Sequence, residues 1–262
     1  MKLCWVFLLA EIAACSGKVA LRHRPRRDAV HHYVLTMRHS RDDAPIVAVA
    51  RTEQVWTIYF TQLARFTDRR GAGSEISLQI DSAQVQPSAA DLSALNGATI
   101  LAFFDGRGQL QRTEPDTAPG MLRAIAAVMA PWFPEEPIEP GDGWTVTTPA
   151  PLEVLELSGQ DSSKLQLRAR LTALQKTVND WIADVGINAQ LPAGETRVMT
   201  SLGALPARLS GTMIGRYRFS LPRSVMIFEE LSVSLTLVTD APRVGRDTVL
   251  SRLVTQTTIR LQ

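Results

Sequence analysis

The sequence predicts a mainly β protein, a β-rich α+β fold whose curved antiparallel sheets divide into two half-barrel-like halves. Apolar and polar residues alternate with period two over most of the chain, as in strands with one face on a core. One segment, near residues 119–132, changes clearly to helical spacing. With 262 residues, 45% hydrophobic and 21% charged, the chain is long enough for one large β domain or two small ones.

Residues 1–14 are typical of a signal peptide. Lys2 precedes the apolar run 3–10, which is too short to span a bilayer as a helix. Residues 12–15, Ile-Ala-Ala-Cys, resemble the bacterial lipobox, in which a cysteine is lipidated. The resemblance implies that Cys15 carries acyl chains and anchors the protein in the bacterial cell envelope, at the outer membrane and facing the periplasm. The alternatives are an ordinary cleaved signal peptide with a chance cysteine and an uncleaved apolar N-terminus.

Residues 15–29 are predicted to be a lipidated tether, because they are polar, basic and aperiodic. The arginines of this segment are suited to rest on anionic lipid headgroups near the anchor. A merely solvated linker is the alternative.

Residues 30–133 are predicted to form the first β half. Residues 33–37 alternate between the two faces of a strand, and residues 55–60 are rich in β-branched and aromatic side chains. Residues 76–80 alternate again. Asn96-Gly97 then marks a hairpin turn before another apolar strand.

The helix predicted near 119–132 has one continuous apolar face, and Pro131 and Pro134 favour its end. We expect it to pack into the concavity of a sheet. The alternative is that this face lines a groove for an apolar ligand or a lipid. The residues of that groove wall would be Met121, Leu122, Ile125, Val128, Met129 and Trp132.

A proline-rich linking segment over residues 134–144 is predicted to lead into a second β half, residues 145–262. The cleanest strand pattern lies at 231–237, where leucine and valine alternate with serine and threonine. Residues 171–185 fit either a strand followed by a short helix or a strand plus a loop. Residues 186–210 are rich in Gly, Pro and Ala and predict a long irregular connection.

Two segments resemble a group of uncharacterised bacterial lipoproteins of unknown function. Residues 104–108, Phe-Asp-Gly-Arg-Gly, make an acidic hairpin turn, and residues 134–144 combine spaced prolines with Gly-Asp-Gly-Trp. The resemblance extends over about residues 90–240. It implies curved antiparallel sheets, similar to the open half-barrels of lipoprotein-carrier proteins, and it brings no catalytic residue.

The sequence offers no recognisable catalytic, metal or cofactor site. The histidines all lie near the N-terminus, where we interpret them as surface or tether residues, and the body has no cysteine, so zinc is disfavoured. No G-x-S-x-G elbow is present. Adjacent acids such as Glu229-Glu230 are interpreted as solvated. A net charge of +2 gives no support to nucleic-acid binding through counterion release.

The leading functional hypothesis is therefore a non-enzymatic cell-envelope lipoprotein that binds an apolar ligand or lipid in a curved sheet. Its partners would be the membrane, through the N-terminal lipid, and such a ligand. A second hypothesis is a structural or assembly lipoprotein that docks other envelope proteins through an edge strand. A third is a hydrolase whose site is not recognisable in the sequence.

Overall fold

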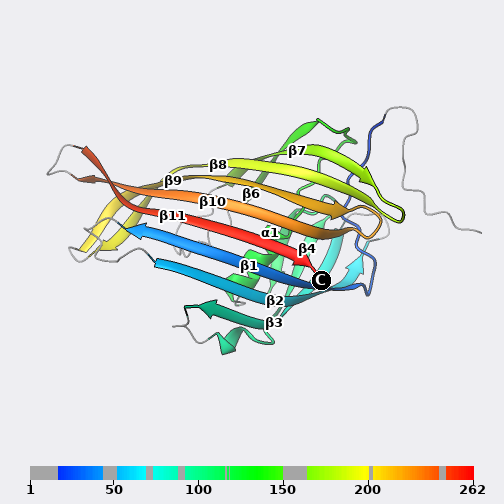
Figure 1. The fold of residues 1–262 in the computed structure, drawn as a ribbon, viewed down its shortest axis with the longest axis horizontal. Coiled ribbons are helices and arrows are strands. Elements are labelled where there is room, and N and C mark those ends of the chain that lie inside the picture. Colours follow the sequence, from blue (N-terminus) through cyan, green and yellow to red (C-terminus); the bar gives the residue numbers. More distant parts are fainter. Residues whose placement is uncertain are drawn as a thin grey trace, which may run out of the picture.

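Eleven strands form one antiparallel sheet that is curved and open, accompanied in the described residues by a single α-helix (Figure 1). The computed structural model describes residues 17–43, 52–68, 73–87, 92–115, 117, 119–149, 164–200, 203–241 and 246–262. The signal peptide expected over 1–14 and the lipidation expected at Cys15 lie outside these ranges. The elements are β1 Val30–Asp43, β2 Thr52–Thr67, β3 Gly73–Gln86, the 3-10 helix η2 Ser93–Leu95, β4 Thr99–Asp105, β5 Leu110–Glu114, α1 Gly120–Val128, β6 Gly143–Pro149, β7 Lys164–Lys176, β8 Trp181–Thr200, β9 Gly203–Ser220, β10 Val225–Ala241 and β11 Arg246–Leu261.

The strand order places the first and last strands side by side in the middle of the sheet. The order is β5-β4-β3-β2-β1-β11-β10-β9-β8-β7-β6, and Tyr33 of β1 lies opposite Leu261 of β11. The mainly β, curved antiparallel fold is confirmed. The two halves predicted over 30–133 and 145–262 join in one continuous sheet, and their buried residues share one hydrophobic cluster.

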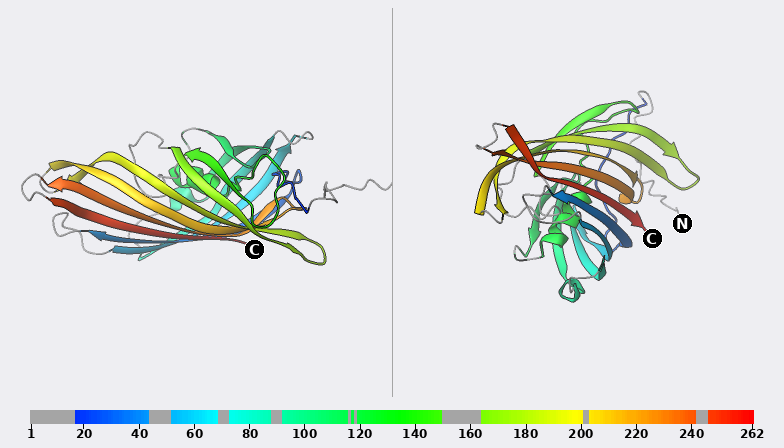
Figure 2. Two further views of the ribbon diagram at one scale, coloured as in Figure 1. Left: turned by 90° about the horizontal axis from the view of Figure 1, so that it is seen from above. Right: turned by 60° about the vertical axis from the view of Figure 1, so that its left-hand side comes forward.

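The connector, residues 119–142, lies on the hollow side of the curved sheet (Figure 2). It links the edge strand β5 to the opposite edge strand β6 and contains α1. The side of the sheet that it covers is called the connector face below. The helix ends at Val128, earlier than the predicted residue 132. Pro131 cannot donate a backbone hydrogen bond and disfavours the helical conformation of Ala130, so both residues continue as irregular chain.

One prediction about the second half is wrong, and for residues 171–185 the structure decides between the two alternatives. No helix forms there: residues 171–176 continue β7, a turn follows at 177–180, and β8 begins at Trp181. Residues 186–210 are not an irregular connection, because β8 and β9 run through most of them as paired strands. The alternation of Ile187, Ala189 and Leu191 on the buried side explains why the small residues of this region still form a strand.

Glycine at two positions of β9 allows β10 to pack closely on the connector face. A side chain at Gly215 would place its Cβ 2.6 Å from the Glu230 carbonyl oxygen and 2.9 Å from Leu231 Cδ1. A Cβ at Gly211 would likewise overlap with Leu235. The leucines of β10 therefore occupy the space that larger residues on β9 would have filled.

The segment predicted as a tether differs from that expectation over residues 17–29. Val19 forms an isolated bridge with Ile138 of the connector, and Leu21 is fully buried in the core. Buried Leu21 and His23 alternate with Arg22 and Arg24, which face outward at least in part. The charged residues between the buried ones explain why the segment resembles a solvated linker in sequence.

Candidate functional site

The proposed groove-wall residues lie at the interface between the connector and the sheet. Leu122, Ile125 and Val128 are at most 3% exposed, and Met129 and Trp132 are 8% and 5% exposed. Met121 packs against the same cluster and is partly buried. The structure thus places all six residues in or against one hydrophobic cluster that the connector shares with the sheet.

A small cavity lies beside the connector. Its volume is about 10 Å³, which is room for about one water molecule. Its walls come from the N-terminal segment, β2, β3, β4, the connector, β9, the turn before β10 and the start of β10. They comprise His23, Gln62, Ile76, Leu78, Phe104, Met129, Phe219, Ser224, Val225 and Met226.

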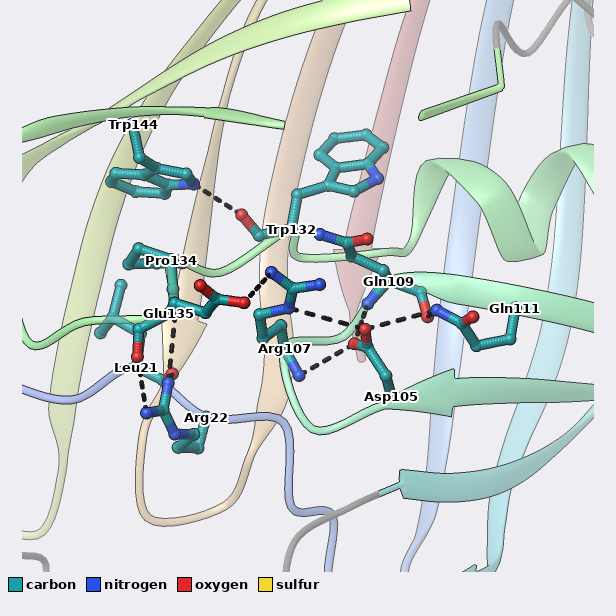
Figure 3. A network of polar contacts seen from close by, with 10 residues as sticks. All are labelled: Leu21, Arg22, Asp105, Arg107, Gln109, Gln111, Trp132, Pro134, Glu135 and Trp144. Carbon is teal, nitrogen blue, oxygen red and sulfur yellow. Dashed lines mark hydrogen bonds and ion pairs between the residues drawn. The ribbon is translucent and has the colours of Figure 1, made fainter. Parts of the chain in front are cut away.

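The end of the connector is held by a network of polar contacts (Figure 3). Arg22 donates to the Pro134 and Glu135 carbonyl oxygens, at 3.1 and 2.8 Å. The Arg107 guanidinium pairs with the Glu135 carboxylate at 3.0 Å. Trp144 of β6 donates its indole N–H to the Trp132 carbonyl oxygen at 2.7 Å. These contacts fix residues 132–135 between the N-terminal segment and both edges of the sheet.

The hairpin turn between β4 and β5 positions Arg107 for that network. The Asp105 carboxylate accepts from the backbone N–H groups of Arg107 and Gln109, both at 2.9 Å. The Arg107 carbonyl oxygen then accepts from the Phe133 N–H at 2.8 Å. The acidic turn at 104–108 and the start of the 134–144 segment, which carry the resemblance described above, therefore meet in space.

Pro131 occupies a position that two other residues make possible. The Tyr217 hydroxyl of β9 donates a hydrogen bond to the Pro131 carbonyl oxygen. Gly108 has φ +75°, and a Cβ at this residue would overlap with the Pro131 ring and lie 3.2 Å from His23 Cβ. A glycine is needed here both for the left-handed backbone and for the close approach of the connector.

Trp132 is the strained residue of the connector, with φ +47°. A bulky residue in this left-handed region costs free energy, and it persists only where its surroundings hold it. The indole of Trp132 is buried and its carbonyl oxygen binds Trp144. Packing and hydrogen bonding together therefore offset the strain.

His23 is a buried residue, contrary to the expectation that the histidines lie on the surface or in a tether. Its ring lies 5.2 Å from that of Phe104, and Nδ1 is 3.2 Å from the Ser74 hydroxyl oxygen. Burial lowers the pKa of His23 to about 4, so the ring is neutral at neutral pH. The sequence signal for its burial was its position two residues after Leu21, on the same face of an extended segment.

Glu229 is the second buried titratable residue that the sequence interpretation missed. The pair Glu229-Glu230 was expected to be solvated, yet Glu229 is 0% exposed and neither of its carboxyl oxygens has a hydrogen-bond partner. Burial raises the pKa of Glu229 well above its usual range. Glu229 shares the inward phase of Leu231 and Val233 on β10, whereas Glu230 points outward and pairs with Arg216 at 3.0 Å.

The site is apolar with a few isolated polar groups. Among the described residues no group of three histidine, cysteine, aspartate or glutamate side chains is placed to hold a metal ion. Within the same ranges no helix has the length and apolar character needed to cross a bilayer.

Comparisons with known proteins show a distant likeness to solved structures. No family model matches the chain, and no curated protein sequence matches it significantly. One solved structure with some similarity is a DUF1329 family protein from Desulfovibrio piger, which has 9% identity and a TM-score of 0.21 over 90% of this chain and 87% of that one.

Proposed function

We propose that the protein is a non-enzymatic, lipid-anchored protein of the bacterial cell envelope that binds an apolar ligand, such as an acyl chain, against the connector face. The observation that carries the proposal is the connector itself. It is a separate apolar layer that crosses the hollow of an open sheet from one edge to the other. An apolar chain can replace its contacts with the sheet, because apolar burial is not directional.

The connector has the properties of a displaceable layer. α1 has only nine residues and no side-chain cap at its N-terminus, and a helix this short is marginal without tertiary contacts. The following Trp132 is strained. The polar contacts that hold residues 132–135 are partly exposed, so water can replace them when the segment moves.

The cavity of about 10 Å³ is far smaller than an acyl chain, so ligand uptake requires the connector to move away from the sheet. The docking hypothesis receives less support from the β5 edge of the sheet. β5 has only five residues and carries an exposed Arg112–Glu114 ion pair at 2.7 Å. Short, charged edge strands disfavour the addition of a partner strand.

Native mass spectrometry of the full chain tests this proposal. The Cys15→Ser variant, which lacks the acylated cysteine, is purified from cells and measured before and after organic extraction. We expect an apolar molecule that is lost on extraction, and uptake of dodecan-1-ol by the extracted protein. An apo mass throughout, with no uptake, would contradict ligand binding.

The anchor is tested separately by the mass of the mature wild-type N-terminus. We expect cleavage before Cys15 and the added mass of acyl chains, with the Cys15→Ser variant as the unlipidated control. Cleavage at another residue would contradict lipidation and leave the ligand proposal standing.

A further inference from the structure

Glu229 is a buried carboxyl group. The binding of a purely apolar chain would not use it. Glu229 is 0% exposed, and both oxygens lack hydrogen-bond partners. The strand register places it between Tyr217 on β9 and Ile259 on β11. An unpaired polar group in a core costs free energy that a leucine at this site would not cost.

Glu229 lies beneath the connector, next to a residue that binds it. Residues directly opposite in an antiparallel ladder have side chains on the same face and in mutual reach, as Glu229 and Tyr217 do. The Tyr217 hydroxyl donates to the Pro131 carbonyl oxygen. Displacement of the connector would therefore free the Tyr217 hydroxyl and open the space above Glu229 at the same time.

We infer that Glu229 and Tyr217 form a polar anchor for the hydroxyl head of an amphipathic chain that takes the place of the connector. The inference rests on the proposed binding of an apolar chain. A hydroxyl can donate to the Glu229 carboxyl oxygen and accept from the Tyr217 hydroxyl, so each group gains a partner. The neighbouring Phe219, Leu231 and Ile259 are apolar and buried, so they suit the alkyl part of the ligand.

An uncharged head fits this site better than a charged one. Burial raises the pKa of the Glu229 carboxyl well above its usual range and so favours its protonated form. A neutral carboxyl offers one donor and one acceptor and no charge to balance an ammonium or carboxylate. Burying an ionised head would also add its full desolvation cost.

The test compares two ligands that differ in one hydrogen-bond donor, dodecan-1-ol and dodecyl methyl ether. Their dissociation constants are measured for the full Cys15→Ser chain and for three variants in that background. Glu229→Leu removes the polar group, Glu229→Gln keeps a neutral donor and acceptor, and Glu230→Gln changes the outward neighbour as a control. Leucine suits the buried site, so the decisive variant is expected to fold.

We expect Glu229→Leu to shift the ratio of the two dissociation constants by about tenfold toward the ether, as loss of one buried hydrogen bond implies. Glu229→Gln and Glu230→Gln should leave the ratio within about twofold of the parent chain. Binding of both ligands with an unchanged ratio in Glu229→Leu would overturn the anchor and leave chain binding intact. If neither ligand binds, the proposed function is overturned, and the anchor with it.

Discussion

Glu229 and Tyr217 lie directly opposite each other in the ladder between β10 and β9, and both side chains are buried on the connector face. The carboxyl group is without a partner, whereas the hydroxyl group binds the connector at Pro131. Burial raises the pKa of Tyr217 well above its usual range, and the Glu229 carboxyl adds to this shift. The pair thus combines a destabilising and a stabilising polar group in adjacent positions.

Replacement of Glu229 by leucine is expected to stabilise the fold by about 1–3 kcal/mol, because an unsatisfied polar group is exchanged for an apolar one of similar size. The measurement is the free energy of unfolding in urea at pH 7. Glu230→Gln is the matched control and should change it by less than about 0.5 kcal/mol, because the Glu230–Arg216 pair is more than half exposed. A less stable Glu229→Leu chain would show that Glu229 has a favourable partner.

Loss of the Tyr217 hydroxyl is expected to have the opposite effect. Tyr217→Phe leaves the buried Pro131 carbonyl oxygen without its donor, which should lower the free energy of unfolding by about 1–3 kcal/mol. Tyr59→Phe serves as a control, because Tyr59 is 38% exposed and water can replace its contacts. Equal effects of the two substitutions would argue against a special role of Tyr217 in holding the connector.

Stability should depend on pH through two buried groups with opposite shifts. The pKa of His23 falls from its usual 6.5 to about 4. The contribution of His23 to the free energy of unfolding is therefore complete above pH 6.5 and is lost as the pH falls toward 4. The pKa of Glu229 rises well above 4.5, so its contribution is complete below pH 4.5 and is lost as the pH rises. Between pH 4.5 and 6.5 the free energy of unfolding therefore rises with pH through His23 and falls with pH through Glu229.

Above pH 6.5 only the Glu229 slope remains of these two, and unfolding free energy should decrease by up to about 1.4 kcal/mol per pH unit. Urea titrations from pH 4 to 9 measure this profile. Glu229→Gln should flatten the slope above pH 6.5, and His23→Phe should remove the loss on the acidic side. A parent profile that stays flat from pH 7 to 9 would mean that Glu229 is ionised in the folded protein.

Gly108→Ala is expected to weaken the packing of the connector at Pro131. Gly108 and Gly97 have nearly equal φ values, +75° and +78°, but only the Gly108 Cβ would meet neighbouring atoms, those of Pro131 and His23. Gly97→Ala therefore measures the backbone cost alone, about 1 kcal/mol. Gly108→Ala should cost at least about 1–3 kcal/mol more in unfolding experiments, because Pro131 must shift. Similar losses of unfolding free energy for the two variants would show that Pro131 can move away from residue 108 at little cost.

The fold class was predictable because nearly every strand keeps its period-two pattern, as residues 231–237 do. The extent of β8 and β9 was not, because Gly, Pro and Ala in 186–210 have low strand propensity and only tertiary pairing makes them strands. The helix was found from its apolar face, but its end was placed too late because Pro131 outweighs the periodicity.

The site was predictable in part. The apolar residues of the connector were identified as one face, since helical spacing reports a shared direction. Glu229 and His23 were missed because their residue types are ordinarily exposed, although each shares the phase of buried neighbours on its own segment. The pairing of β1 with β11 left no local signal at all, because it joins residues more than two hundred positions apart in sequence.

That central pairing has a consequence for how the chain reaches its native state. Among the eleven described strands β1 is synthesised first and its partner β11 last, so the middle of this sheet closes only after the other strands exist. Contacts this distant in sequence slow folding, and until β11 pairs with it, β1 exposes an unpaired edge. The growing chain is thus most prone to mispairing at the place that is most protected once the protein is complete.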